Sequence, residues 1–419
     1  MTPKKKLKPT EFKSRILAKD MRWKYLEDND RYLSENPAPK YRFNIIGAGM
    51  MGIEHIQVCH IEGRSEVHGI YDPSKRVIKI NKLLAARDTG KRLKVYQTLE
   101  EAISDPEVDG LIVSSPNYTH IDIARVISKI GKDKHIYMEK PMATTVEDAW
   151  EMTQIAKKHE KNGKVFQIGL QYRYKSLYQE AIHEAFERQS VGNIKIINIT
   201  KHRIPFLDKV NQWNKFNKFS GGTIVEKCCH YLDMLSYFTK SKPKKVYAIG
   251  TQAVNYKKLN YEGKKSDILD NAMATIEYEN GIQAGFNLVM FAPQTYEEVT
   301  ICGDRGRLRA FSNHDFLNNS IPKSMIEVYR GENHASRIAE INFPDFVENK
   351  GHGGASFYMF IKFIDKIEGK STLDGVPEIA TVEEGLWSII LASAIQESIE
   401  TGEPVIIKEF LKVSGIPKI

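Results

Sequence analysis

The sequence predicts an α/β fold, with an N-terminal Rossmann domain and a C-terminal α+β domain that carries a large open, mainly antiparallel sheet. Three observations support this. Short apolar strands alternate with helices up to about residue 170, a glycine-rich turn follows the first strand, and longer strand-like runs dominate after about residue 175. Alternation of strand and helix is typical of a parallel sheet with helices on both faces.

The first domain is expected over residues 41–170. A helix pattern from about Gly49 to Ile61 follows the first strand, and helical segments separate the later ones. The expected strands are Phe43–Ile46, Glu66–Tyr71, Gly110–Ser114, His135–Met138 and Val165–Gly169. Their short, continuous apolar runs fit strands that are buried on both faces.

The second domain is expected over residues 171–419 and is assigned to substrate binding and oligomerisation. The pair Asn280-Gly281 between two alternating runs is the strongest short hairpin signal. Expected strands are Ile194–Lys201, Lys245–Thr251, Asn271–Tyr278, Ile282–Phe291 and Glu297–Cys302, and expected helices are Tyr178–Glu187, Ala355–Ile367 and Val382–Thr401. We expect the last helices to pack back toward the Rossmann domain.

Residues 1–40 are interpreted as a basic arm, because they hold eleven Lys and Arg against six Asp and Glu in a chain of net charge +8. Residues 11–34 could form a helix before Pro37 and Pro39. The remaining chain is close to neutral and contains no nucleic-acid-reading module, so we expect no nucleic-acid partner. No apolar run is long enough for a membrane helix and no signal h-region follows the basic start, so a cytoplasmic protein with no membrane partner is expected.

The four cysteines, Cys59, Cys228, Cys229 and Cys302, include no pair with zinc-ligand spacing. We therefore expect reduced thiols and no metal site.

The turn after the first strand reads G-A-G-M-M-G over Gly47–Gly52, which is the G-x-G-x-x-G pattern. Gly47 allows the tight turn, Gly49 lets the backbone approach a pyrophosphate, and Gly52 lets the helix pack on the strand. The free N–H groups of the helix N-terminus attract phosphate. Asp72 stands 20 residues after Gly52, at the end of the second strand. Its carboxylate suits an adenosine ribose and repels a 2′-phosphate, so NAD is favoured over NADP.

Two polar loops follow later strands, where ligands bind in parallel sheets. With these loops the chain resembles the glucose–fructose oxidoreductase/inositol dehydrogenase (Gfo/Idh/MocA) family over about residues 41–419. The matching pieces are Gly47–Gly52, Asp72, Pro116 to His120, Glu139-Lys140-Pro141, Gly221-Gly222 with Glu226, His230 and Asp233, and Gly303–Leu308. Many relatives have Asp at the position of Glu226.

The resemblance implies roles for the matched positions. Catalytic residues are Lys140 and His230, the latter as acid/base partner, with Glu226 beside them. Cofactor-binding residues are Gly47, Gly49, Met50, Met51, Gly52, Asp72, Ser115, Pro116, Asn117, His120, Glu139 and Lys140. The residue types agree: a lysine ammonium stabilises a developing alkoxide, and it acts as a base if its pKa falls toward neutrality.

Other residues are candidates for the substrate pocket. Arg173 follows the last Rossmann strand and is a candidate to bind substrate hydroxyls. His202, Arg203 and Trp213 follow the first strand of the second domain, and Trp213 is a candidate to stack on a sugar face. His352 lies in the glycine-rich segment Gly351–Gly354. His230 lies four residues after Glu226, on one helical face. Except for His230, each of these residues is interpreted equally well as a structural or surface residue.

The leading hypothesis is an NAD(H)-dependent oxidoreductase acting on a ring hydroxyl or ketone of a sugar, inositol or related polyol. A second is a glycoside hydrolase that uses tightly bound NAD in transient redox, and a third is a non-catalytic NAD-binding regulator. Because open sheets of this kind usually pack in pairs, a homodimer or homotetramer is expected, with the arm embracing a neighbour.

Overall fold

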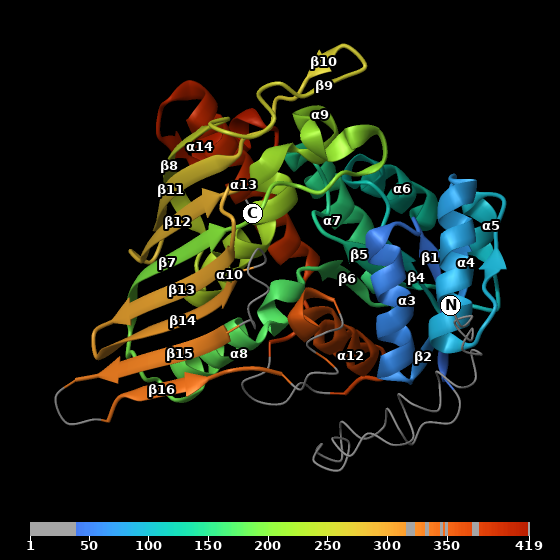
Figure 1. The fold of residues 1–419 in the computed structure, drawn as a ribbon, viewed down its shortest axis with the longest axis horizontal. Helices are drawn as coiled ribbons and strands as arrows, with labels where there is room; N and C mark the ends of the chain where they lie inside the picture. Colours follow the sequence, from blue (N-terminus) through green and yellow to red (C-terminus); the bar gives the residue numbers. More distant parts are fainter. Residues whose placement is uncertain are drawn as a thin grey trace, which may run out of the picture.

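The computed structural model describes residues 39–315, 323–331, 335–343, 347, 351–370 and 377–417. The predicted arm helix over residues 11–34 lies outside these residues. Two sheets dominate the molecule, one at each end (Figure 1). Among the described residues, no helix combines the length and apolarity needed to cross a membrane.

The first sheet has six strands in the order β3-β2-β1-β4-β5-β6, and every pairing is parallel. This is the predicted Rossmann-like sheet. Its strands are β1 (Tyr41–Ile46), β2 (Ser65–Tyr71), β3 (Lys94–Val95), β4 (Gly110–Val113), β5 (His135–Glu139) and β6 (Phe166–Gly169). Its helices are α3 (Met50–Glu62), α4 (Lys75–Thr89), α5 (Leu99–Ser104), α6 (His120–Ile130) and α7 (Val146–Glu160).

The second sheet has nine strands in the order β16-β15-β14-β13-β7-β12-β11-β8-β17, and only the β7–β12 pairing is parallel. The predicted turn at Asn280-Gly281 joins β11 to β12 as an antiparallel hairpin. Its strands are β7 (Ile194–His202), β8 (Pro243–Thr251), β11 (Asn271–Tyr278), β12 (Gln283–Val289), β13 (Thr295–Gly303), β14 (Gly306–His314), β15 (Lys323–Arg330), β16 (Arg337–Glu340) and β17 (Val405–Ile406); β9 (Asn260–Tyr261) and β10 (Lys264–Lys265) pair separately.

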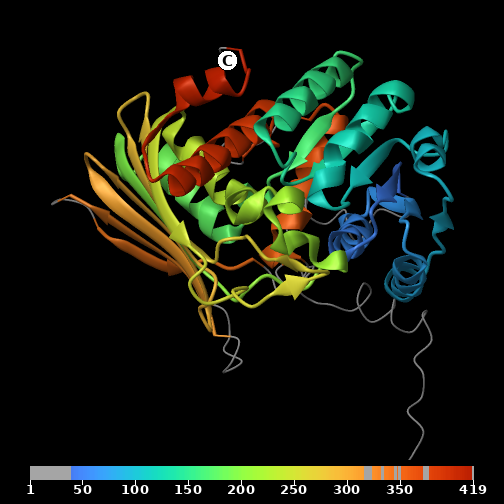
Figure 2. The ribbon, with the colours of Figure 1, turned by 90° about the horizontal axis from the view of Figure 1, so that it is seen from above.

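Helices fill the space between the two sheets and leave the outer face of the nine-stranded sheet uncovered by any described helix (Figure 2). They are α8 (Ser176–Ile182), α9 (Asn217–Ser220), α10 (Cys229–Thr239), α12 (Ala355–Ile367), α13 (Val382–Thr401) and α14 (Ile407–Val413). Helix α12 packs against α3, and α13 packs against both α7 and β8. The C-terminal helices therefore bring the second sheet against the first, and the candidate site lies where they meet.

Candidate active site

The glycine turn after β1 has the geometry that its sequence predicts. Gly47 has φ +86°, and a Cβ there would lie 2.5 Å from the backbone of Ser115. A Cβ on Gly52 would lie 2.8 Å from the Gly47 carbonyl oxygen. At Gly49, by contrast, a Cβ would meet nothing within 4 Å. The turn is thus closed against the sheet and open above Gly49, which fits the approach of a dinucleotide pyrophosphate.

Asp72 ties this turn to the end of β2. Its two carboxylate oxygens accept hydrogen bonds from the backbone N–H groups of Ala48 and Ser74, at 2.9 and 2.8 Å. Each oxygen keeps a lone pair for a further donor, and the side chain is half-buried. Met50 is exposed and Met51 is half-buried at the start of α3, beside the open turn.

The loop after β4 is held by His120, which is fully buried. Its ring nitrogens lie 3.0 Å from the Ser115 carbonyl oxygen and 2.9 Å from the Pro141 carbonyl oxygen. His120 therefore links the two polar loops and has no ring nitrogen left for a cofactor, so direct cofactor binding is not supported. Burial lowers the pKa of His120 despite these carbonyls.

The other residues of this loop are either partly exposed or hold the loop in place. Ser115 and Pro116 are half-buried, and the Ser115 hydroxyl lies 2.6 Å from that of Thr119. Asn117 is buried and donates to the Ser220 carbonyl at 3.3 Å, which joins the loop to the second domain.

Glu139, at the end of β5, is buried and faces a partner that the sequence did not predict. Its Oε1 lies 2.8 Å from Nε2 of His55, on α3, and its Oε2 accepts from the backbone N–H of Lys140 at 3.1 Å. His55 is itself buried, and its Nδ1 has no hydrogen-bond partner. A single histidine within a helix carries no signal in the sequence that separates this role from a core position.

Lys140, in a loop of the Rossmann domain, meets Glu226 of the second domain. The Lys140 ammonium donates to the Glu226 carbonyl oxygen at 2.9 Å and lies 3.7 Å from Oε2 of the Glu226 carboxylate. Burial works against the charge of Lys140, but Glu226 raises its pKa above the ordinary value. Conversely, burial opposes ionisation of Glu226, but Lys140 and other lysines lower its pKa. Lys140 is therefore an ammonium donor in this state, and the lowered pKa that a lysine base needs is absent.

His230 stands at the start of α10, directly after a π-helical turn over Ile224–Cys228 that carries Glu226. Such turns are frequent at functional sites. Its ring is 1% exposed and stacks on Tyr172, with ring centroids 3.9 Å apart and an interplanar angle of 2°. Neither ring nitrogen has a hydrogen-bond partner.

The protonation of His230 follows from its surroundings. Burial, and then the charges of Lys140 and Lys227, lower its pKa well below the usual value. The imidazole is thus neutral and has one free acceptor nitrogen and one free donor nitrogen. Two unmatched buried polar atoms are costly and fit a site that a polar ligand completes.

His352 lies in the same region, as the glycine-rich segment allowed. Its Nδ1 is 2.9 Å from Oε1 of Glu54, on α3, and its ring centroid is 6.4 Å from that of Tyr172. Burial alone would raise the pKa of Glu54, but His352 and Ser356 lower it to about 2. Glu54 therefore positions His352, and it is a second residue of α3 that the sequence did not single out.

Arg173 corrects one of the sequence-based assignments. Its guanidinium is 1% exposed and makes two hydrogen bonds to the Asp233 carboxylate, at 2.8 and 2.5 Å. It also lies 2.9 Å from a carboxylate oxygen of Glu384, on α13. Arg173 therefore joins α10 to α13 as a buried ion pair, which does not support the expected role in binding substrate hydroxyls.

His202 is also corrected, by the two-residue period of a strand. Along β7, Ile197, Ile199 and Lys201 are buried against the helices, whereas His202 points to the opposite face, with its ring 5.8 Å from that of Tyr296. The inward residue is its neighbour Lys201, whose ammonium lies 2.9 Å from Oε2 of Glu297. Burial lowers the pKa of Lys201 to about 8. Apolar residues occur on both faces of β7, at Ile196 as well as at Ile197 and Ile199, so the sequence does not mark Lys201 as an inward residue.

Trp213 does not offer the open ring face that stacking on a sugar needs, because it is only 8% exposed. It sits in a short 3₁₀ segment, Val210–Lys215, in which Asn211 and Gln212 have positive φ. The Lys215 ammonium anchors this segment by donating to the Phe206 carbonyl at 2.5 Å. The structure thus supports a scaffold role for Trp213.

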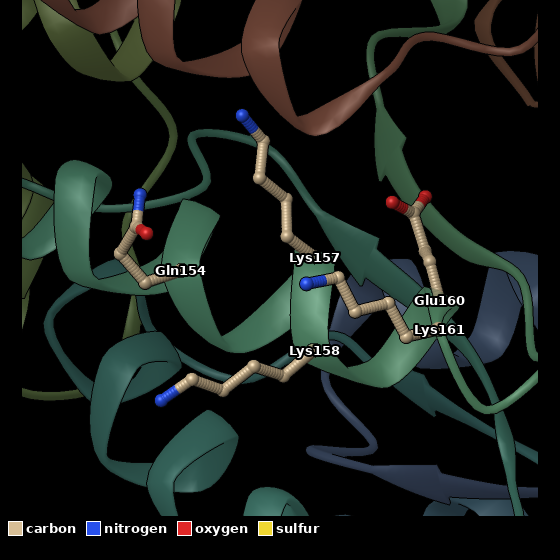
Figure 3. Close-up of a pocket in the computed structure, with 5 residues that line it drawn as sticks. All are labelled: Gln154, Lys157, Lys158, Glu160 and Lys161. Carbon is tan, nitrogen blue, oxygen red and sulfur yellow. The ribbon is translucent and has the colours of Figure 1, made fainter.

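Two other features lie outside this site. A hollow of about 470 Å³ on the outer face of α7 is lined by Gln154, Lys157, Lys158, Glu160 and Lys161 (Figure 3). None of these residues belongs to the candidate site.

In the described part of the chain, His68, Asp105 and Glu107 are the one group close enough to share a metal ion. The Lys94 ammonium already lies 2.6 Å from Asp105, so we interpret that group as an ion-pair network.

Two family models match this chain, one for each of its two domains. Residues 41–168 match the NAD-binding Rossmann fold of an oxidoreductase family, and residues 183–407 match that family's C-terminal alpha/beta domain. The chain belongs to the Gfo/Idh/MocA oxidoreductase family. The predicted resemblance is confirmed, and with it the fold class.

Individual relatives of this family are distant in sequence. The uncharacterized oxidoreductase YrbE of Bacillus subtilis is 25% identical over 381 residues, which cover 88% of this chain and 97% of the relative. The myo-inositol 2-dehydrogenase of Thermotoga maritima is 22% identical, with coverage of 88% and 99%. The WlbA dehydrogenase of Bordetella pertussis, solved with NADH and UDP-GlcNAcA, is 21% identical and aligns with a TM-score of 0.65 over 88% of this chain and 98% of that one.

Proposed function

We propose that this oxidoreductase is an NAD(H)-dependent dehydrogenase that acts on a ring hydroxyl or ketone of a sugar, inositol or related polyol. The observation that carries the proposal is a partly buried Lys140 ammonium whose charge acts on a buried, neutral His230, and the ring nitrogens of that histidine have no partner. Both lie beside loops that follow strands of the Rossmann sheet, where cofactors bind. The name of the Thermotoga maritima relative supports a polyol substrate.

His230 and Lys140 have different roles when the hydroxyl proton is removed. In the oxidation direction, neutral His230 accepts the hydroxyl proton of the substrate. The Lys140 ammonium donates a hydrogen bond to the same oxygen and stabilises its developing negative charge. Glu226 keeps Lys140 charged, Tyr172 fixes the imidazole plane, and NAD, when bound, supplies the acceptor for the hydride of the ring carbon.

The proposal is tested with purified protein, NAD and a panel of inositols, hexoses, sugar acids and glycosides, by following the absorbance of reduced nicotinamide. We expect a rise with one substrate class and no rise for a His230→Asn variant that still binds NADH. If no member of the panel is oxidised but a glycoside is cleaved, the hydrolase with transient redox replaces the dehydrogenase. If NADH binds and neither reaction occurs, the regulator hypothesis gains.

For the cofactor, we propose NAD rather than NADP. The Asp72 carboxylate stands at the end of β2 with lone pairs free, and it repels a 2′-phosphate. The substitution Asp72→Asn keeps an acceptor for the Ala48 N–H but removes the charge. We expect it to shift the ratio of NADH to NADPH affinity toward NADPH by about 10-fold, the order of one charge-assisted hydrogen bond. Fluorescence titration with both cofactors measures the ratio, and an unchanged ratio would remove Asp72 from cofactor selection.

We also propose that the chain forms a homodimer or homotetramer through the outer face of the nine-stranded sheet. Tyr247, Ile249 and Met273 are about half exposed on this face, and Met273 pairs with Ile249 across β8 and β11. Exposed apolar groups on a sheet face mark interaction surfaces. Light scattering should give a multiple of the chain mass, and Met273→Lys should lower it while Met273→Leu does not. A monomeric wild type would contradict the proposal.

A further inference from the structure

Positive charge accumulates around the catalytic pair. Six cationic side chains come from four separate segments, and they influence one another's pKa values and that of His230. They are Lys140, Lys175, Lys201, Arg203, Lys209 and Lys227. Like charges that gather in a partly buried region repel one another, so the arrangement is unfavourable unless negative charge offsets it.

Carboxylates of the protein offset only half of these cations. The ammonium groups of Lys175 and Lys201 form ion pairs with Oε2 of Glu297, at 2.7 Å and 2.9 Å. The ammonium of Lys140 forms an ion pair with Glu226. Glu139 is already engaged with His55. The other three cations have no carboxylate within ion-pair distance in the part of the chain that the structure describes: Arg203, Lys209 and Lys227.

Arg203 and Lys227 have only neutral partners. The Arg203 Nε donates to the Ile204 carbonyl at 3.0 Å, and its guanidinium lies 5.1 Å from the Phe206 ring centroid. The Lys227 ammonium donates to the Tyr172 hydroxyl at 2.6 Å. Lys209 is different, since its ammonium donates to the Met50 sulfur at 4.0 Å, beside the glycine turn.

Contacts link Lys227 to the side of the sheet that carries Arg203. The Lys175 ammonium lies 4.3 Å from the centroid of the Tyr172 ring and shares Glu297 with Lys201. Arg203 stands two residues after Lys201, so the alternation of the strand turns both side chains to the same face.

Lys227 contacts Tyr172, the residue that packs against His230. Tyr172, whose hydroxyl accepts from Lys227, is the ring on which His230 stacks. Burial, followed by repulsion from Arg203, lowers the pKa of Lys227 well below its ordinary value. An anion between Lys227 and Arg203 would offset the repulsion between them, favour the charged form of the lysine and give the arginine the bidentate partner that its geometry suits.

We propose that the substrate is an anionic sugar or polyol, whose carboxylate or phosphate binds between Arg203 and Lys227 while Lys140 and His230 hold the reacting hydroxyl. This inference rests on the proposed dehydrogenase function and narrows its substrate class. A neutral sugar would give neither cation an ion-pair partner, which disfavours it.

The test is isothermal titration calorimetry on the NAD-loaded protein, with glucose, glucose 6-phosphate and glucuronate, and with galactose and galacturonate as a second pair. We expect at least one anionic sugar to bind about 10-fold or more tighter than its neutral counterpart, since a hydrogen bond to a charged group contributes that order of affinity. The phosphate and carboxylate arms distinguish the two anions. Similar binding of neutral and anionic sugars, or no anionic binding, would overturn the proposal.

Variants separate this contact from the catalytic residues. Arg203→Met and Lys227→Met should each weaken binding of the anionic sugar by about 10-fold and leave the neutral sugar and NADH affinities unchanged. Lys132→Met, at an exposed loop position of the Rossmann domain, is the matched control and should change nothing. Equal losses for neutral and anionic sugars would contradict the assignment. Failure of the proposed function looks different: an anion binds selectively but nicotinamide is never reduced.

Discussion

The Lys140→Met variant is expected to lose about 10²–10³-fold in kcat, the usual cost of removing one preorganised donor to a developing oxyanion. The methionine fills the same space but donates no hydrogen bond to the reacting oxygen. The affinity for NADH should fall much less than kcat, because the glycine turn and Asp72, which we expect to hold the phosphates and the ribose, are untouched. Steady-state kinetics with the best substrate of the panel and NADH fluorescence titration measure the two effects.

A control addresses the partner of Lys140. Removing the ammonium leaves the buried Glu226 carboxylate without its ion pair, so part of a loss could come from disturbance of the π-helical turn. The double variant Lys140→Met/Glu226→Gln removes both charges and should remain as inactive as the single variant. Recovery of activity in the double variant would show that Lys140 acts through Glu226 and not on the substrate.

The Arg173→Met variant is expected to lower the free energy of unfolding by about 3–5 kcal/mol, because it strands a buried carboxylate. Asp233 is 2% exposed and has Arg173 as its ion-pair partner. Denaturant unfolding followed by circular dichroism measures the change in midpoint.

The double variant Arg173→Met/Asp233→Leu replaces the pair by apolar groups and should regain most of the lost stability. NADH affinity and the Michaelis constant of the folded fraction should stay close to wild type in both. A large rise in Michaelis constant without loss of stability would restore Arg173 as a substrate ligand.

Much of the fold follows from local patterns in the sequence. The predicted bounds of β11, α12 and α13 agree with the structure, because period-two alternation or long apolar helical faces mark them clearly. The strands β14, β15 and β16 were not predicted. In β15 the buried residues Ser324, Ile326 and Val328 do alternate, but a polar serine among them and flanking charges weaken the pattern.

Site residues that belong to a sequence motif were predictable. Residues whose position in the site depends on how the helices and strands pack were not. Gly47, Asp72 and Lys140 occupy the turns that their motifs indicate. His55 and Glu54 could not be found, since their roles depend on which elements α3 faces. His202 was chosen in place of Lys201 because spacing within a strand fixes alternation, but the sequence alone does not say which face is inward.

The central claim is that a ring C–H of a sugar gives its hydride to NAD, with Lys140 and His230 beside the hydroxyl on that carbon. A substrate deuterated at the reacting carbon tests this directly, by mass spectrometry of cofactor and product after reaction. We predict that the deuterium is found on the reduced nicotinamide, that the product is a ketone, and that His230→Asn transfers none. Deuterium that remains in, or returns to, the sugar product would contradict net dehydrogenation.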